Sequence, residues 1–349
     1  MLPSCPEFPT TFTDPADRLA WLGHLSGQDG QAPGFPGVRN LGMSEEGRPV
    51  WAATVGSGPR TATLISGSHA DEPVGTETLL FLLREVIRRP SEFRRLLSEF
   101  TLTVIPQVNP DGEARNQSWV NAWPSLSAYL QEVCRELPGR DIEFGYPDLR
   151  VENRLVAGAM KAAAPLHLHM SLHGMGLSGG AMLLIDRYWA FRTEALRNGF
   201  REAAASAGLP MHDHNRKGEK GFFQIEPGFT TTPEGTAMRA FFESRLDPET
   251  AARFRDSSME FARHLGGDPL CVVTELPLFL VRGASRPGIP DAYLAFRAVK
   301  KEALAAVRAG ADPVSVFASL PAEPLPLETA VQLQWEAVSL SLDTVSGWN

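Results

Sequence analysis

His69 and Glu72 stand three residues apart, after the short apolar run 61–65 and a glycine, Gly67. A neutral imidazole and a carboxylate at this spacing can both reach one zinc ion from a strand-to-helix turn. Zinc that catalyses hydrolysis needs three protein ligands and one open position for water, so a third ligand must come from elsewhere in the chain. The pair alone is a weak signal, and the competing interpretation is a surface histidine and glutamate that cap the helix after them.

Three histidines alternate along the segment 166–173 and are candidates for the third ligand. In a strand, His167, His169 and His173 would all project from one face. We favour His173, because it stands at the predicted carboxyl end of the strand with Gly174 beside it. His167 and His169 lie deeper in the strand and are better explained as buried histidines with hydrogen-bond partners.

Glu275 is the candidate for the general base. It ends the apolar run 270–274, where an unpaired buried carboxylate would be costly. A zinc-bound water is one partner that would explain a carboxylate at this place, and such a carboxylate can accept the proton of that water. The alternative is an ion pair with an arginine such as Arg282.

Strand-like and helix-like segments alternate around these residues, and this alternation predicts βαβ units and a largely parallel or mixed sheet. The expected helices include 75–89, 152–163 and a single helix from 247 to about 264 that begins at an Asp-Pro-Glu sequence. The expected strands are 49–54, 62–66, 102–106, 166–172, 181–185 and 271–275.

Two segments lie outside this alternation. Residues 1–40 are rich in Pro and Gly and are expected to wrap the surface around one short helix, 15–25. Beyond Pro290 the chain is predicted to be mainly helical, in the segments 291–309 and 328–340. We therefore divide the chain into an N-terminal lead-in (1–40), a catalytic domain (41–285) and a C-terminal helical appendage packed on the same domain (286–349).

The composition indicates a soluble enzyme in a reducing compartment. A net charge of -8 over 349 residues gives no electrostatic reason to expect nucleic acid or an anionic membrane as a partner. The three cysteines are widely separated and odd in number, which excludes a cysteine-based zinc cluster. The first residues lack the pattern of a secretion signal, and no apolar run approaches the roughly 18 residues of a membrane span. We expect a cytoplasmic protein, and the oligomeric state stays open.

Four segments in this order resemble the M14 family of zinc metallocarboxypeptidases: His69-x-x-Glu72, Asn-Pro-Asp-Gly at 109–112, Ser-Leu-His-Gly at 171–174 and Thr-Glu-Leu-Pro at 274–277. They cover roughly residues 45 to 282, and their joint order is far more specific than any one of them. The resemblance implies a three-layer α/β/α sandwich with a mixed, mostly parallel, twisted sheet of about eight strands. It also implies that His69, Glu72 and His173 hold one zinc ion per chain and that Glu275 is the base and proton shuttle.

The residues that would bind the substrate are less clearly marked. We expect Arg115, which follows the Asn-Pro-Asp-Gly turn, to help zinc stabilise the oxyanion and, with Asn116 and Arg154, to bind the substrate. The family usually binds a terminal carboxylate with an Asn-Arg pair, often within Asp-x-Asn-Arg-Asn, and no such run occurs here. Adjacent Asn-Arg residues stand only at 153–154, in an apparent helix start later than expected, and at 215–216. The family's mobile tyrosine is absent as well, and Ser171 stands where many members have an Asp that orients a zinc-bound histidine.

The sequence therefore predicts a zinc-dependent hydrolase that cleaves an amide or peptide bond, with a small peptide or an N-acyl amino acid as substrate. The segment from His69 to Gly75 also resembles the succinylglutamate desuccinylase and aspartoacylase branch, so an N-acyl amino acid deacylase is the first alternative. A relative that keeps the fold for binding without catalysis is the second.

Overall fold

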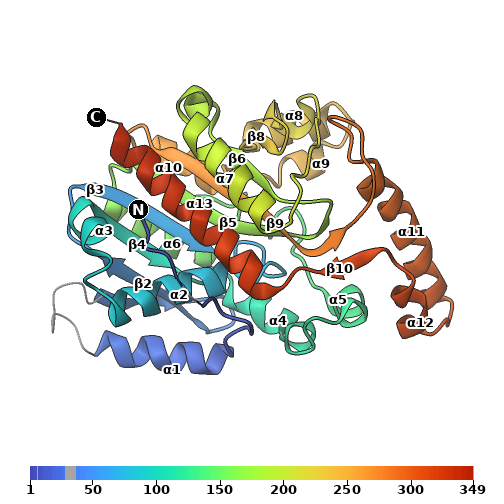
Figure 1. The fold of residues 1–349 in the computed structure, drawn as a ribbon, viewed down its shortest axis with the longest axis horizontal. Helices are drawn as coiled ribbons and strands as arrows, with labels where there is room; N and C mark the ends of the chain where they lie inside the picture. The colour runs from blue at the N-terminus through green and yellow to red at the C-terminus, as the bar shows by residue number, and fades with distance from the viewer. Residues whose placement is uncertain (6, 28–36, 349) are drawn as a thin grey trace.

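The structure, a computed structural model, describes residues 1–5, 7–27 and 37–348. These residues form one β-sheet with helices on both of its faces (Figure 1). The predicted three-layer α/β class is confirmed. Part of the predicted N-terminal lead-in, residues 6 and 28–36, lies outside the described residues.

The described part of the chain contributes ten strands to this sheet, in the order β1-β2-β4-β3-β5-β9-β6-β8-β7, with β10 paired to β9. The sheet is mixed but not mostly parallel, since only β3–β4, β3–β5, β5–β9 and β6–β8 pair in parallel. The prediction of about eight strands missed short strands that are too brief to show a period. The strands are β1 (Gly37–Met43), β2 (Pro49–Val55), β3 (Arg60–Ser66), β4 (Phe100–Ile105), β5 (Leu168–Ser178), β6 (Met182–Ile185), β7 (Gln224–Glu226), β8 (Phe229–Thr231), β9 (Leu270–Val281) and β10 (Ala322–Pro324).

The central strands β5 and β9 are longer than the sequence predicts. Their parallel register runs from Leu168 opposite Leu270 to Ser178 opposite Leu280. The expected end of β5 beside His173 is therefore wrong, because pairing with β9 carries both strands beyond this point. His173 stands inside β5 and lies opposite Glu275 in β9.

Helices cover both faces of this sheet, and each face has its own apolar core. One face is covered by α2 (Val74–Arg88), α7 (Glu194–Ser206) and α13 (Leu327–Gly347), which enclose the larger core. The other face is covered by α6 (Val151–Ala163) and α10 (Ser258–His264) over a second core. The strands between these layers are buried on both sides, which explains their nearly continuous apolar runs.

The C-terminal segment has two different parts. Helix α13 lies across the sheet beside α2 (Figure 1), and the side-chain amide of Gln334 donates hydrogen bonds to His173 O and Thr274 Oγ1 at 3.0 and 3.1 Å. It is therefore part of a main layer. The helices α11 (Asp291–Arg308) and α12 (Pro313–Ala318) instead project at one end of the molecule (Figure 1).

The single helix predicted from 247 to 264 is wrong, since the structure has α9 (Pro248–Ala251), a break, and then α10. Ser257 starts the second helix. Its Oγ accepts a hydrogen bond from Glu260 N at 3.2 Å, while Glu260 Oε2 accepts one from Ser257 N at 2.8 Å. This reciprocal cap favours a new helix start over a continuous helix.

The other helices connect these layers. They are α1 (Pro15–Ser26), α3 (Arg94–Glu99), α4 (Pro110–Asn121), α5 (Leu126–Glu132), α8 (Gly235–Glu243) and the short 3₁₀ segments η1 (Arg187–Arg192) and η2 (Glu219–Gly221). Among the described residues, no helix combines the length and the apolar character that crossing a membrane requires.

Candidate metal centre and cavity

A sharp turn between β3 and α2 presents His69 and Glu72. Gly67 opens this turn with φ +77°, and a Cβ at this position would stand 2.0 Å from Gln107 Oε1. Only glycine fits both conditions. The turn then closes through a hydrogen bond from Glu72 N to His69 O at 3.1 Å, which leaves both side chains on the same side.

Gly75 brings the start of α2 close to β5, the strand that carries His173. A Cβ on Gly75 would lie 2.5 Å from Leu172 O and 2.8 Å from Ser66 Cβ. The helix can approach the sheet this closely because the glycine has no side chain. The close approach sets the distance between the β3–α2 turn and His173.

His69, Glu72 and His173 meet at one point. His173 Nδ1 lies 2.9 Å from His69 Nδ1 and 2.8 Å from Glu72 Oε2, and His69 Nδ1 lies 3.2 Å from Glu72 Oε2. Donor atoms bound to one tetrahedral zinc ion at about 2.0–2.2 Å lie roughly 3.3 Å apart, so the three atoms are placed as a single ion would need them. Two imidazole nitrogens and one carboxylate oxygen are also the donor types that suit zinc.

Each histidine turns its other ring nitrogen towards a carboxylate. His69 Nε2 lies 3.4 Å from Asp141 Oδ1, and His173 Nε2 lies 3.2 Å from Glu143 Oε2 and 2.8 Å from Ser171 Oγ. Carboxylates on the outer nitrogen fix the ring orientation and tautomer of metal-binding histidines. Both histidines are therefore held with Nδ1 towards the common point.

Sequence analysis missed Asp141 and Glu143, because they lie in the irregular segment between α5 and α6, where no periodicity marks them. Glu143 Oε1 accepts hydrogen bonds from Ser258 N and Oγ at 3.1 and 2.6 Å, which tie this segment to the start of α10. One chemical rule could have indicated such carboxylates: a buried metal-binding imidazole needs a hydrogen-bond acceptor for its second ring nitrogen. Because Ser171 replaces the expected Asp, that acceptor had to be found elsewhere.

The carboxylates make this point favourable for positive charge. Burial opposes a charge on His173, but hydrogen bonds to Glu143 and Glu72 outweigh it and raise the pKa of the imidazole to about 9. Burial likewise opposes ionisation of Glu72, but His69 and Arg135 hold the pKa of its carboxyl well below the usual range. A cluster that attracts protons in this way is also suited to a metal cation.

Glu275 stands beside this cluster without a hydrogen-bond partner for one of its oxygens. It is partly exposed as a residue, yet its Oε2 is buried and has no partner among the described residues. Burial and the nearby charge of Glu72 raise the pKa of its carboxyl to about 8. The alternative ion pair with Arg282 is wrong, since Arg282 is exposed and donates to Glu323 Oε2 at 2.8 Å.

Arg135, rather than Arg115, is the arginine at the metal centre. Its Nη1 donates to Glu72 Oε1 at 2.6 Å and lies 3.3 Å from Asp71 Oδ2. Arg115 points elsewhere and donates to Glu46 Oε1 at 2.5 Å. Its place on the outer side of α4 explains the difference, because the Asn-Pro-Asp-Gly segment is the capped start of this helix and not a loop beside the metal centre.

The structure brings neither of the other predicted substrate-binding residues to the centre. Asn116 is buried inside the protein, where its side chain accepts from Trp119 Nε1 at 2.7 Å and donates to Cys134 O at 2.8 Å. Arg154 is exposed on α6. Asn116 thus has a local role in the fold that its spacing from the motifs did not reveal.

His167 and His169 stay away from the cluster, as the sequence analysis favoured. His167 Nδ1 accepts a hydrogen bond from Thr61 N at 3.1 Å at the beginning of the sheet. His169 is fully buried, its Nδ1 lies 2.7 Å from Thr63 Oγ1, and burial lowers the pKa of its imidazole to about 4. His169 is therefore a neutral histidine inside the sheet.

A cavity of about 350 Å³ opens at the cluster. It is lined by His69, His173, Glu275 and Arg135, and four of its other lining residues are phenylalanines. The remaining lining side chains are Glu136, Pro138, Asp141, Glu143, Phe144, Leu184, Arg216, Lys220, Phe222, Pro233, Met238, Phe242, Phe254, Ser257, Met259 and Val273.

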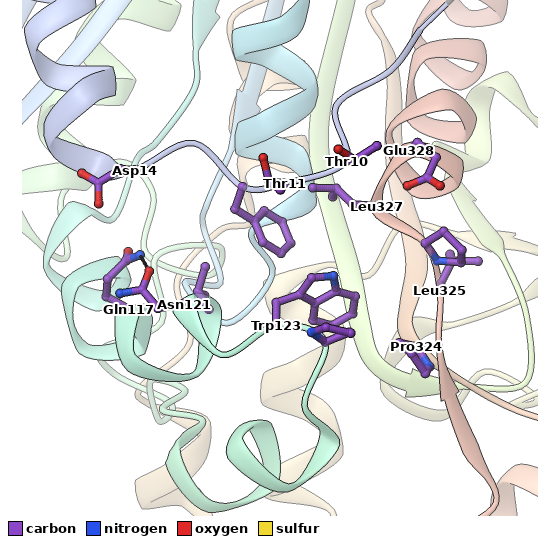
Figure 2. Close-up of a pocket in the computed structure, with 14 residues that line it drawn as sticks. Thr10, Thr11, Asp14, Gln117, Asn121, Trp123, Pro324, Leu325, Leu327 and Glu328 are labelled. Atoms are coloured by element: carbon purple, nitrogen blue, oxygen red, sulfur yellow. Dashed lines mark hydrogen bonds between the residues drawn. The ribbon is translucent and has the colours of Figure 1, made fainter.

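A second hollow, of about 460 Å³, lies away from this centre and is shown in Figure 2. It is bordered by the N-terminal segment, the end of α4 and the residues before α13. Trp123 occupies its middle, and its two carboxylates, Asp14 and Glu328, stand on opposite sides (Figure 2). None of the described residues that line it is a histidine, so the hydrolytic centre predicted from the sequence belongs to the smaller cavity.

Comparison with known proteins points to one family. Residues 21–150 match the family model for zinc carboxypeptidases, Peptidase_M14. A metallo-carboxypeptidase from Burkholderia cenocepacia has the same fold, with a TM-score of 0.56 at 15% identity over 97% of this chain and 70% of that chain. Over the matched residues the chain is similar to the M14 zinc carboxypeptidases, and it has a fold like theirs.

Curated relatives of this carboxypeptidase-like protein match only part of it. Carboxypeptidase B from Astacus astacus is 29% identical over 108 residues, which are 30% of this chain and 35% of the relative. Inactive metallocarboxypeptidase ecm14 from Talaromyces marneffei is 27% identical over 96 residues, which are 24% of this chain and 16% of the relative. The chain thus spans about a third or less of the length of these relatives.

The carboxypeptidase-like protein departs from the family pattern at the position of Ser171. The serine hydroxyl lies between His173 and Glu143, and Glu143 supplies the carboxylate that the missing Asp would have provided. The orienting function is thus retained although its residue has moved to another segment.

Proposed function

We propose that this protein is a zinc-dependent amide hydrolase of the carboxypeptidase type. The observation that carries the proposal is the meeting of the His69, Glu72 and His173 donor atoms beside the unpartnered Glu275 oxygen. Three protein ligands with an adjacent carboxylate are the parts that hydrolytic zinc sites use. Zinc held by these three residues would lower the pKa of a coordinated water and polarise the amide carbonyl.

Glu275 acts as the base. Its carboxyl accepts a proton from the attacking water and later gives it to the leaving amine, so that one group serves both steps. A pKa near 8 in the absence of metal would be too high for a base at neutral pH, but a divalent cation at the cluster adds a positive charge that lowers it.

Arg135 binds the carbonyl oxygen as negative charge develops on it. Although burial disfavours its charge, Glu72 and Asp71 raise the pKa of the guanidinium above its ordinary value, so it stays charged throughout. One Nη1 donor is used by Glu72, and the fork of a guanidinium leaves further N–H groups for a substrate oxygen. Fixed donors of this kind favour the transition state over the substrate.

The absence of an Asp-x-Asn-Arg-Asn run also supports the first alternative, a deacylase that acts on N-acyl amino acids. A panel of N-acyl dipeptides and N-acyl amino acids, assayed before and after chelation and after zinc is restored, separates the possibilities. We expect hydrolysis that disappears on chelation and returns with about one zinc per chain. A preference for N-acyl amino acids would favour the deacylase. A zinc-loaded protein that hydrolyses none of them would contradict the proposal and favour a binding protein. The name of the ecm14 relative describes that protein as inactive.

A further inference from the structure

Two cations line the same cavity as the metal centre without an anionic partner among the described residues. They are Arg216, which precedes η2, and Lys220, which lies within it. In the part of the chain that the structure describes, neither side chain makes an ion pair or a hydrogen bond with another side chain. Both stand over aromatic rings instead, with Arg216 Cζ 3.9 Å from the Phe222 ring centre and Lys220 Nζ 5.5 Å from that of Phe242.

Of the acidic side chains that line the cavity, Glu275 belongs to the metal centre, and the other three have partners of their own. Glu136 accepts hydrogen bonds from Asn109 Nδ2 at 2.7 Å and Arg115 Nη2 at 3.4 Å. Asp141 and Glu143 face the two histidines of the metal centre. The cavity therefore has a metal-binding end, where carboxylates are used, and a cationic end, where two positive charges are free to meet a ligand.

Burial gives these cations a reason to bind an anion. It lowers the pKa of both Arg216 and Lys220, and Arg216 lowers that of Lys220 further, so their charges are held together at a cost. The nearby Arg297 adds to the positive field, and Glu219 is the acidic group that opposes it. A bound carboxylate would relieve this repulsion and form charge-assisted hydrogen bonds.

The wall of the cavity is apolar. It includes Phe144, Phe222, Met238, Phe242 and Phe254, of which Phe242 and Phe254 stack with their ring centres 5.4 Å apart. This surface would pack against an aromatic or aliphatic part of a ligand and exclude water from it. A ligand that fits the whole cavity thus combines an apolar body with a negative end.

We propose that Arg216 and Lys220 bind the carboxylate of an amide substrate whose apolar body lies against this aromatic wall. The two cations, which come from a segment distant in sequence from the metal ligands, thereby take the role of the Asp-x-Asn-Arg-Asn run, which the sequence does not contain. The inference rests on the proposed function in one respect: it assumes that the amide of the substrate lies at the metal centre. Binding of a carboxylate to Arg216 and Lys220 can be measured without any hydrolysis.

Calorimetric titration of the whole chain with 3-phenylpropionate, as purified and again after metal removal, tests binding separately from hydrolysis. We expect binding in both forms, a loss of about tenfold or more in affinity for Arg216→Met, a smaller loss for Lys220→Met, and partial retention for Arg216→Lys. Lys217→Met is the matched control, because Lys217 is exposed in the same segment and does not line the cavity. Binding to the metal-free form also excludes a carboxylate held only by zinc.

The neutral analogue 3-phenylpropionamide should bind at least about tenfold more weakly than the acid, since it lacks the charge that the cations recognise. Equal binding of acid and amide, unchanged affinity in both the Arg216 and Lys220 variants, or no binding to the metal-free form would overturn the inference. If the acid binds as expected but no amide is hydrolysed, the cationic site stands and the proposed function fails. If the protein hydrolyses amides with zinc, but Arg216→Met cleaves acidic and neutral substrates as fast as the wild type, the proposed function stands and the cationic site fails.

Discussion

Glu143 Oε2 lies 3.2 Å from His173 Nε2, on the side of the imidazole opposite the Nδ1 atom that faces Glu72. The glutamate comes from an irregular segment and the histidine from the central strand β5, so the contact joins two parts of the chain that the motifs do not connect. It gives His173 one defined orientation, which a metal ligand requires.

Glu143→Gln should weaken zinc binding by about 10- to 100-fold, because the amide keeps much of the shape but no longer polarises the imidazole. Competition with a chromogenic chelator measures the dissociation constant. Glu85→Gln serves as the control, since Glu85 is also buried but pairs with Arg88 and Arg89 on α2. Equal zinc affinity in the two variants would contradict a positioning role for Glu143.

Replacing His173 should remove the bound zinc, whereas replacing His169 should not. His173→Ala removes one of the three donors and should abolish zinc binding, whereas His169→Ala should keep about one zinc per chain. The second variant should lose stability by roughly 1–3 kcal/mol, since it removes a buried side chain and its contact with Thr63. Zinc content by atomic absorption and urea unfolding measure the two effects. Full zinc in His173→Ala would assign the third ligand to another residue.

Arg135 and Arg115 offer a matched pair of substitutions. Arg135→Met should lower kcat by about 100-fold or more with zinc still bound, because it removes the donor next to the polarised carbonyl. Arg115→Met should leave kcat near the wild-type value, since its partners are Glu46 and Glu136. Steady-state kinetics on one amide substrate measure both. A larger effect from Arg115 would favour the assignment made from the sequence.

The metal-free protein should lose stability as the pH rises because of Glu275. The pKa of this carboxyl is about 8 in the folded chain against a usual value of 4.5, so the folded chain binds the proton more tightly. The resulting stabilisation is complete below about pH 4.5 and is lost as the pH rises to about 8. Melting temperatures of metal-free wild type and Glu275→Gln between pH 5 and 8 should therefore diverge in favour of the variant. A constant difference across this range would contradict a protonated buried carboxyl.

The sequence was sufficient for the parts of the site that strands and their turns position. Apolar runs located β3, β5 and β9. The spacing from His69 to Glu72, and the alternation of histidines that includes His173, identified residues that the structure brings together. These features depend on local backbone geometry, which a strand-to-helix turn fixes over a few residues.

The rest depended on long-range packing that no local pattern encodes. Asp141, Glu143 and Arg135 reach the centre from an irregular segment, and the hydrogen bonds of Glu143 to Ser258 help to place that segment. Arg115 was chosen for its distance from a motif, but helix α4 turns it towards Glu46. Which of several similar arginines faces a cavity follows only from the assembled fold.

The central claim is that Glu275 transfers protons at a zinc centre, and Glu275→Gln tests it most directly. The amide preserves the shape of the side chain but cannot act as a base. We predict a folded variant with about one zinc per chain and a turnover lowered by roughly 100-fold or more on any amide that the wild type cleaves. Zinc content, melting temperature and rate are to be measured on one preparation. A stable, zinc-loaded Glu275→Gln protein with wild-type turnover would contradict the account.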